Sequence, residues 1–387
     1  MWLSDVKLIL ADRIIENGAL RIDNGVIAEV VEGAGQPSGF TVFPGFVDMH
    51  GDMIEMELEP RPKVEFPMEV AVGHLDARLA AAGVTTAYAG VSFSRTAVDG
   101  QRRSFAHTSA IIRALKDNIQ GLRVDHRIHA RFDMTYTAAI DALDGLLTAE
   151  AVDLVSVMDH TPGQGQYRNV ETLVANRMKS GLSESQARAH VERRIQNAIS
   201  ADQVFENLQR ISKLCRSHGV AMASHDDDTV GKSHLMADIG AVISEFPVTM
   251  KAAEVARERG LMVAMGAPNA MRGQSYSGNL SARDAHGAGL LNILAADYHP
   301  AAILPAIHAL APADPDGLVG AARLASKNPA QSLGLMDRGE IAVGLRADLV
   351  IVDHNSRVVE TFSAGQSIFS NGSGPKVSAQ TDIAAVA

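Results

Sequence analysis

The feature that most constrains the fold is a series of eight short apolar runs separated by helix-length amphipathic stretches. The runs lie at 42–49, 84–92, 127–133, 153–158, 220–224, 241–246, 261–266 and 292–296. Helical candidates between or after them include 68–82, 106–119, 184–217, 250–259, 279–289 and 316–326. Alternating strands and helices are typical of a parallel sheet covered by helices, and eight units are the number in a (β/α)8 barrel. The sequence therefore predicts an α/β fold with a TIM-like (β/α)8 barrel over 44–337.

The two ends of the chain show a different pattern, short alternating strands without helices between them. Residues 5–31 contain Asn17-Gly18 and Asn24-Gly25, dipeptides that favour tight hairpin turns. Residues 340–369 return to the same alternation. We expect residues 1–43 and 338–370 to pair into a small β-sandwich beside the barrel, and the polar residues 371–387 to form a flexible tail.

Charge and composition exclude several classes of function. The chain has 35 Lys and Arg residues against 45 Asp and Glu, a formal net charge of −10, which argues against nucleic acid or anionic lipid as a partner. Its single cysteine, Cys215, cannot form an intramolecular disulfide and lies in a helical stretch, where packing is the expected role. Neither a secretory signal nor a long uninterrupted apolar segment is present. These features predict a cytoplasmic protein with no membrane partner.

Side chains that bind metals follow five of the predicted strands, where the reactive residues of a barrel lie. His50 and Asp52 follow the first run and, as residues i and i+2 of an extended strand, face the same side. The other strand ends carry Asp159 and His160, His225 with Asp226 to Asp228, Glu245, and Asp297 with His299. One of the three consecutive aspartates is also expected to cap the following helix. Because such groups cost roughly several kcal/mol to bury unless they are paired or metal-bound, the pattern predicts a metal site.

Carboxylate oxygens combined with imidazole nitrogens suit several divalent cations, so we expect one or two ions, Zn²⁺ first, with Mn²⁺ or Fe²⁺ as alternatives. A bound cation lowers the pKa of its water and makes hydrolysis the expected chemistry. Signatures of phosphate-loop ATPases, zincins and α/β-hydrolases are absent from the sequence. Whether His126, just before the third run, or His129, within it, also faces the site stays open.

Several motifs together resemble the amidohydrolase superfamily, and the likeness spans about residues 3 to 369. They are PGFVDMHGD (44–52), ASHDD (223–227), AADY (295–298), KNPAQSLGL (327–335) and GEIAVGLRADLVIVD (339–353). A second set resembles a diphosphatase branch of this superfamily that acts in phosphonate catabolism. That set comprises EPRPKVEFP (59–67), SVMDHTPGQGQ (156–166), SEFPVT (244–249), MGAPNAMRGQSYSGN (265–279) and AADYHPA (295–301).

The resemblance implies hydrolysis of alpha-D-ribose 1-methylphosphonate 5-triphosphate to the 5-phosphate and pyrophosphate by metal-activated water. It implies His50, Asp52, His225 and Asp297 as metal ligands, Asp159 or His160 at a second metal, and Glu245 as a further candidate. Asp297 would also accept the proton of the attacking water. The sequence departs from the general superfamily pattern in having H-x-D for H-x-H at the first strand and no lysine after the fourth.

A substrate with several negative charges needs cations around it. Basic residues next to strand ends could supply them: Arg61, Lys63, Arg131, Arg168 and Arg272. The alternatives are a C–N bond amidohydrolase of the cyclic amidase or deacetylase type, and an inactive barrel that serves as an assembly scaffold. A small phosphorylated molecule is the expected partner, while a homo-oligomer and association with other phosphonate-pathway enzymes stay open.

Overall fold

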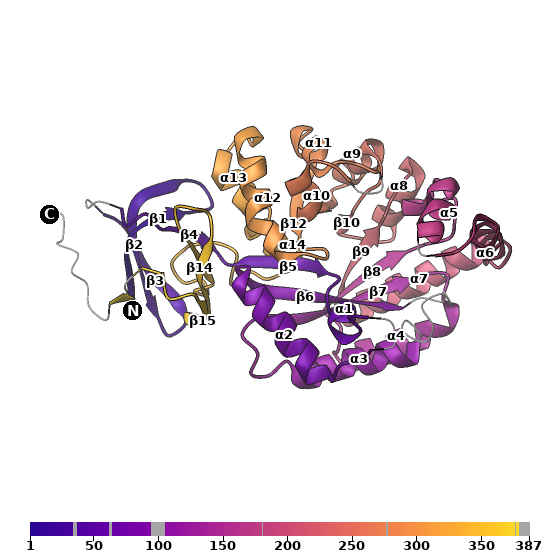
Figure 1. Cartoon of the computed structure of the whole chain (residues 1–387), viewed down its shortest axis with the longest axis horizontal. Helices are drawn as coiled ribbons and strands as arrows, with labels where there is room; N and C mark the ends of the chain where they lie inside the picture. Colours follow the sequence, from indigo (N-terminus) through magenta and orange to yellow (C-terminus); the bar gives the residue numbers. More distant parts are fainter. Residues whose placement is uncertain are drawn as a thin grey trace.

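Eight parallel strands form a barrel in the order in which they occur along the chain (Figure 1). They are β5 (Phe46–Gly51), β6 (Val84–Phe93), β7 (Asp125–Asp133), β8 (Leu154–Met158), β9 (Ala221–His225), β10 (Ile243–Glu245), β11 (Met262–Gly266) and β12 (Leu291–Ala295). The computed structural model describes residues 1–33, 37–61, 64–93, 105–179, 181–275, 278–375 and 377–378. Each of the eight predicted runs overlaps one of these strands, so the predicted barrel is confirmed.

The first and last strands are joined by backbone contacts that nearly close the barrel. The N–H of Asp297 donates to the carbonyl of His50 at 2.8 Å, and the N–H of Asp52 donates to the carbonyl of Asp297 at 2.7 Å. Asp48 reinforces the seam, because its Oδ1 accepts a hydrogen bond of 2.8 Å from the N–H of Ala296. The predicted site residues at the ends of these two strands are therefore neighbours.

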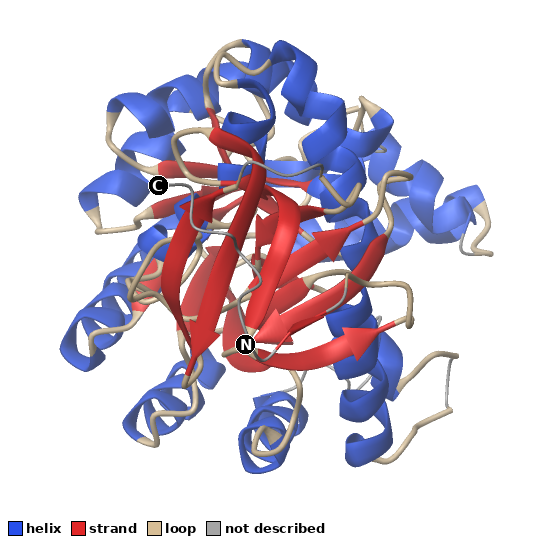
Figure 2. Cartoon of the chain, turned by 90° about the vertical axis from the view of Figure 1, so that its left-hand side faces the viewer, coloured by secondary structure: helices blue, strands red, loops and turns tan. Residues whose placement is uncertain are grey.

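Helices cover the outside of the barrel (Figures 1 and 2). They are α1 (Ile54–Leu58), α2 (Met68–Ala81), α3 (Phe105–Asn118), α4 (Ile140–Thr148), α5 (Val170–Lys179), α6 (Glu184–Gln196), α7 (Ala201–His218), α8 (Val230–Asp238), α9 (Met250–Glu258), α10 (Ala267–Arg272), α11 (Ala282–Gly287), α12 (Ile303–Leu310), α13 (Gly317–Arg323) and α14 (Lys327–Ser332). None of the helices in the described part of the chain is long and apolar enough to cross a membrane.

Two local predictions about helices are wrong. The stretch 184–217 forms two helices, because the side chain of Ser200 accepts a hydrogen bond from the N–H of Gln203 and begins α7 as its N-cap. The cap of α8 is Thr229, whose side chain accepts from the N–H of Lys232, and none of the three preceding aspartates caps that helix. Those aspartates are thereby left free for other contacts.

Apolar side chains fill the barrel below its polar end. Met49, Tyr88, Leu154, Ile243 and Ile293 are buried inside it. A larger apolar core lies between the strands and the surrounding helices. The imidazoles and carboxylates of the strand ends thus sit on a packed apolar floor, which fixes their positions.

Both ends of the chain contribute to a second, separate mixed sheet with the order β15-β14-β13-β4-β1-β2-β3, to which β16 is added beside β1 (Figure 2). Its strands are β1 (Trp2–Ile9), β2 (Ile14–Asp23), β3 (Val26–Glu32), β4 (Thr41–Pro44), β13 (Leu349–Val352), β14 (Val358–Ser363), β15 (Gln366–Ser370) and β16 (Val377–Ser378). The pairing of β4 with β13 joins the two termini, as expected. Part of the predicted tail thus pairs with β1, while 379–387 lies outside the described residues.

One of the two predicted turns in this sheet is correct. Asn24 and Gly25 connect β2 to β3 with φ values of 50° and 82°, the left-handed conformation that such turns require. Asn17-Gly18 lies instead within β2, and the connection from β1 to β2 is made by residues 10–13. A Cβ on Gly18 would lie 2.9 Å from side-chain atoms of Ile15 and Leu8, so tight packing accounts for the glycine there.

Candidate metal centre and active site

Three buried side chains form a first candidate metal-binding cluster at the upper end of the barrel: His50 from β5, His129 from β7 and Glu245 from β10. Nδ1 of His50 lies 3.4 Å from Oε2 of Glu245, and Nε2 of His129 lies 3.6 Å from Oε1 of the same carboxylate. One potential ligand atom from each of the three residues lies within 4.8 Å of the others. Two imidazoles and a carboxylate at such distances can share a cation.

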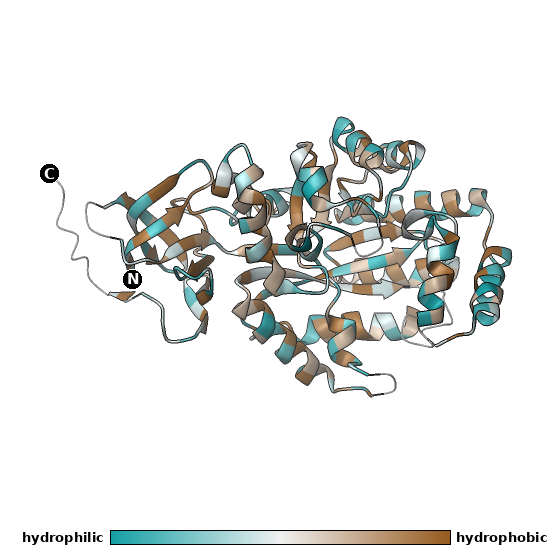
Figure 3. Cartoon of the chain, turned by 45° about the horizontal axis from the view of Figure 1, so that its top comes forward, coloured by the Kyte–Doolittle hydropathy of each residue, from teal (hydrophilic) through white to brown (hydrophobic). Residues whose placement is uncertain are grey.

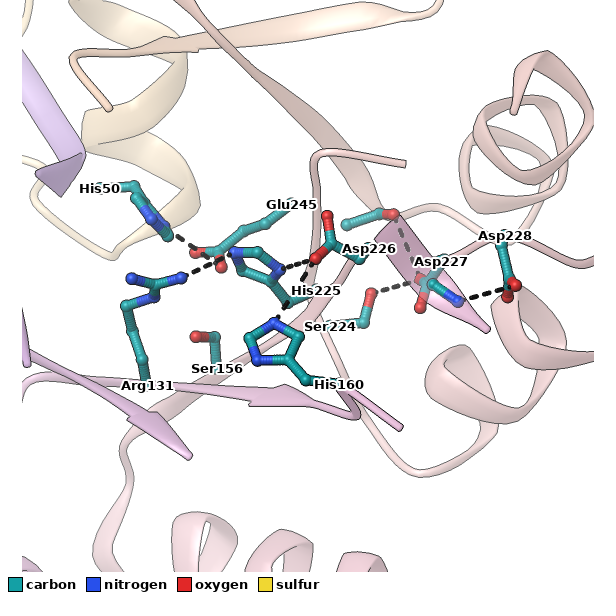
Figure 4. A network of polar contacts seen from close by, with 12 residues as sticks. His50, Arg131, Ser156, His160, Ser224, His225, Asp226, Asp227, Asp228 and Glu245 are labelled. Atoms are coloured by element: carbon teal, nitrogen blue, oxygen red, sulfur yellow. Dashed lines mark hydrogen bonds and ion pairs between the residues drawn. The ribbon is translucent and has the colours of Figure 1, made fainter. Parts of the chain in front are cut away.

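His160, His225 and Asp226 form a second cluster next to the first. Nδ1 of His225 lies 3.0 Å from Oδ2 of Asp226, and Nε2 of His160 lies 3.8 Å from that oxygen (Figure 4). The ring centroids of His50 and His225 are 5.4 Å apart, so the two clusters are neighbours. Asp226 follows β9 with a φ of 55°. This site can accommodate either one or two cations.

The donor atoms of both clusters fit a metal ion. Within the described residues, both ring nitrogens of His50 and both carboxylate oxygens of Glu245 are buried without a hydrogen-bond partner. The same is true of Nδ1 of His129, Nδ1 of His225 and Oδ2 of Asp226. Buried polar atoms without hydrogen bonds are costly, and a divalent cation would accept their lone pairs. Imidazole and carboxylate together are the ligands of Zn²⁺, Mn²⁺ and Fe²⁺.

Electrostatics in the first cluster also favour a positive charge. Burial by itself raises the pKa of Glu245, but the neighbouring His129 and His50 lower it to about 2. Burial lowers the pKa of His50, whereas the charges of Glu245 and Asp52 outweigh this effect and raise it to about 10. The carboxylates therefore hold a cationic partner at His50, either a proton or a metal ion.

Arg131 links the two clusters from β7. Its Nη1 lies 2.5 Å from Oδ1 of Asp52, and its Nη2 lies 3.5 Å from Nε2 of His225. Asp52 also lies 3.3 Å from Nε2 of His50. Burial raises the pKa of Asp52, but Arg131 and His50 keep it well below its usual range. The positive charge of Arg131 is thus paired with a carboxylate of the protein.

Asp297 stands at the edge of the cavity, immediately after β12. Its φ is 56°, and its carboxyl group is half-buried. Burial raises its pKa, and the negative charge of Asp52 adds to this shift. A carboxylate with a raised pKa is a better proton acceptor, which suits a general base.

A layer of polar side chains holds the loop after β9 in place (Figure 4). Oδ2 of Asp227 accepts hydrogen bonds from the hydroxyls of Ser224 and Ser244, at 2.5 and 3.3 Å. The ammonium group of Lys232 donates to the carbonyls of His225 and Asp226 at 3.1 and 3.3 Å. These contacts orient the second cluster from behind, as is typical around metal ligands.

A cavity of about 340 Å³ opens above the second cluster. Its lining includes Asp52, His160, His225, Asp226 and Asp297, together with four arginines: Arg131, Arg177, Arg194 and Arg272. Tyr167 and Asn269 also line it. Acidic and imidazole groups thus share one cavity with several guanidinium groups.

The structure places the remaining predicted residues elsewhere. Asp159 is buried, and its Oδ1 accepts a hydrogen bond of 2.9 Å from the N–H of Thr161. Arg168 is exposed and lines a more open cavity beside the first. Arg61 is exposed and is not among the residues that line the central cavity. Lys63 lies outside the described residues.

Sequence reasoning left His129 open and did not include Asp226, Arg177 or Arg194 in the predicted site. His129 and Arg131 are residues i and i+2 of β7, and this alternation could have placed both on the inner face. His126, the other open candidate, contacts Asp76 at 3.1 Å instead.

Comparison with known proteins gives one clear relative. The chain is 36% identical to the alpha-D-ribose 1-methylphosphonate 5-triphosphate diphosphatase of Escherichia coli (strain K12), over 95% of this chain and 100% of that protein. No family model matches the chain.

Solved structures share the fold at low sequence identity. The 5-methylcytosine deaminase of Klebsiella pneumoniae gives a TM-score of 0.66 at 15% identity, covering 98% of this chain and 100% of that one. The N-acetyl-D-glucosamine-6-phosphate deacetylase of Mycobacterium smegmatis gives a TM-score of 0.63 at 17% identity, covering 95% and 100%. Together with the full-length relative, these similarities show that the chain belongs to the amidohydrolase superfamily, in the same family as the Escherichia coli diphosphatase.

Proposed function

We propose that this chain is a metal-dependent hydrolase that converts alpha-D-ribose 1-methylphosphonate 5-triphosphate to the 5-phosphate and pyrophosphate. The observation that carries the proposal is the 36% identity to a diphosphatase of that name over the whole length of the relative. The cavity supports it, because the second imidazole–carboxylate cluster and four arginines line the same space, with the first cluster next to it, as a polyanionic substrate requires.

We assign His50, His129 and Glu245 to one divalent cation, and His160, His225 and Asp226 to a second, with Zn²⁺ as the first candidate. Such an ion, when bound, polarises a phosphoryl oxygen and lowers the pKa of a coordinated water. Asp52 holds His50 and Arg131 in place through the contacts described above. Asp159 belongs to the turn beside His160 rather than to either cluster.

Asp297 accepts the proton of the attacking water in this mechanism. Its half-buried carboxylate lines the cavity, and its backbone is fixed by hydrogen bonds to the end of β5. Water adds to phosphorus, a phosphoanhydride P–O bond breaks, and pyrophosphate leaves with the bonding electrons. Arg272 lines the same cavity and offsets the negative charge that develops on the phosphoryl oxygens, whereas Arg131, whose charge is already paired with Asp52, contributes less.

Phosphorus NMR of the metal-reconstituted protein tests the proposal. The substrate is supplied in ¹⁸O-labelled water, and ATP and a dihydropyrimidine-type cyclic amide are assayed in parallel. We expect pyrophosphate from the phosphonate substrate, with the label on the phosphorus that was attacked. Turnover of the amide alone would refute the diphosphatase and favour a C–N amidohydrolase.

Asp297→Asn provides the mechanistic control, because it keeps the size of the side chain but removes the proton acceptor. We expect turnover to fall by about 10²- to 10⁴-fold, the usual contribution of a general base, while metal content stays the same. Unchanged turnover would remove Asp297 from this role.

A further inference from the structure

Helices α5 and α6 form a hairpin inserted between β8 and β9, at the end of the molecule farthest from the terminal sheet (Figure 1). The two helices pack through a small core of their own, made by Leu173, Val174, Ala187 and Val191. The outermost helix in Figure 3 shows mainly hydrophilic residues. A hairpin with a separate core presents its side chains to the cavity as one preformed unit.

The outer face of this hairpin is held by paired charges. Arg188 of α6 contacts Glu171 of α5 through two nitrogens, both at 2.9 Å, and Glu184 of its own helix at 3.0 Å. All three side chains are exposed, so this network stabilises the hairpin only modestly. The guanidinium group of Arg188 is therefore already paired with carboxylates of the protein.

Arg177 of α5 and Arg194 of α6 differ from Arg188 in both position and pairing. Both line the central cavity. Among the residues that the structure describes, neither forms an ion pair with a carboxylate. Arg194 donates through Nη2 to the carbonyl of His160 at 2.5 Å and lies 5.8 Å from the ring centroid of Tyr167. One cationic side chain of the hairpin therefore touches the loop that carries a candidate metal ligand.

Arg177 and Arg194 lie close enough for their positive charges to repel each other. Burial lowers the pKa of Arg194, and the positive charge of Arg177 contributes to the same shift, which the charges of Asp133 and Asp159 offset only in part. His190 is also on α6, and burial and the charges of Arg177 and Arg194 lower its pKa too. Holding like charges together in a partly buried place is unfavourable unless an anion compensates them.

We propose that Arg177 and Arg194 bind the terminal phosphates of a polyphosphate, so that the α5–α6 hairpin selects a chain of phosphates over a single phosphate. This inference rests on the proposed function in taking the reacting phosphorus to lie at the imidazole–carboxylate clusters. Arg194 adjoins the second cluster through His160, and Arg177 extends the positive wall of the same cavity. The next phosphates of the chain then meet two guanidinium groups, whose fork of donors matches phosphate oxygens.

Calorimetric titration of the metal-reconstituted protein with inorganic pyrophosphate and with orthophosphate tests the proposal. Arg177→Gln and Arg194→Gln are compared with wild type and with Arg193→Gln. Arg193 is the matched control, because it is exposed, adjacent to Arg194 and absent from the cavity lining. We expect each of the two test variants to weaken pyrophosphate binding about tenfold or more, with orthophosphate binding retained. The control should bind both as wild type does.

Arg177→Gln is the decisive variant, because Arg194 also contacts the His160 loop and its replacement could disturb a metal ligand. Metal content is therefore measured for every variant. An unchanged ratio of pyrophosphate to orthophosphate affinity in Arg177→Gln would overturn the proposal, even if the wild type hydrolyses the phosphonate substrate. Loss of the pyrophosphate preference without such hydrolysis would uphold the anion site and refute the substrate assignment instead.

Discussion

The α-carbon of Gly266 faces the carboxylate of Asp297 so closely that a Cβ there would lie 3.0 Å from Oδ2. Gly266 is the last residue of β11, and Asp297 follows the neighbouring strand. We predict that Gly266→Ala pushes the carboxylate away by a few tenths of an ångström and lowers kcat severalfold, less than the roughly 10²-fold loss that a misplacement of about 1 Å can cause. Pyrophosphate release, measured together with the melting temperature, separates this effect from unfolding.

Gly145→Ala is the control for that substitution. Gly145 lies in α4, is exposed, and a Cβ on it would meet nothing within 4 Å. The alanine should stabilise the fold by roughly 0.5–1 kcal/mol, because glycine is a poor helix former, and should leave kcat unchanged. Full activity of Gly266→Ala would show that Asp297 tolerates the added methyl group.

His225→Ala should abolish metal retention and turnover together. The imidazole is buried, lies 3.0 Å from Asp226 and is the member of the second cluster whose ring is 5.4 Å from that of His50. Since loss of a mere supporting contact costs 10- to 100-fold in metal affinity, we expect at least about 100-fold for a ligand. Metal analysis after dialysis checks this, with the exposed His354→Ala as control. An active, metal-replete His225→Ala would refute the assignment.

Removal of the metal should destabilise the protein. The candidate ligands come from several different strands, so the unfolded chain cannot hold them together. A ligand present at a hundred times its Kd stabilises the native state by about 2.7 kcal/mol. We therefore expect a chelator to lower the Tm, and Zn²⁺ or Mn²⁺ to restore it. The same melting temperature with and without metal would argue against both clusters.

Asp76 gives a prediction on pH that is independent of the site. Burial raises its pKa, but hydrogen bonds from His126 and from the N–H groups of Val124 and Arg123 lower it below its ordinary value of 3.8. A depressed pKa means that the stabilisation is present above the ordinary value and is lost as pH falls through the folded one. Asp76→Asn should lose roughly 1–3 kcal/mol at neutral pH.

Urea unfolding at neutral and acidic pH measures this loss. The variant should unfold with a shallower pH dependence than wild type below about pH 4. Asp141→Asn, at an exposed residue paired with Arg210, should change neither stability nor its pH dependence appreciably. Parallel acid profiles for wild type and Asp76→Asn would contradict the assignment.

Cys215 should be chemically inert in the folded protein. The side chain is buried in the apolar core between the strands and the surrounding helices, and burial raises the pKa of its thiol to about 12. Since the thiolate is the reactive form, a disulfide reagent at pH 8 should react only after denaturant is added. Rapid reaction of the native protein would show that α7 opens easily.

The sequence was sufficient to predict elements whose signal is local. Each barrel strand is an apolar run, and His50, His225 and Glu245 stand at strand ends, where the fold puts its reactive groups. His129 lies inside β7, four residues before the strand ends. Its place in the site could have been predicted only from the alternation of side chains along the strand, which puts His129 and Arg131 on the same inner face. No local sequence pattern predicts that Arg177 and Arg194 line the cavity, because the direction of their side chains depends on how α5 packs on α6. The break at Ser200 was overlooked because polar periodicity continues across it.

The seam between β5 and β12 has a consequence for the order in which the molecule matures. Asp48 and Ala296, which are bonded across it, are 248 residues apart in the chain. Closing such a long loop is entropically costly and slow, and during synthesis it must wait until β12 has left the ribosome. Asp297 cannot reach His50 before that moment. We therefore expect newly made chains to become active only late, after the barrel has closed, and chains truncated before β12 to lack the general base that completes the site.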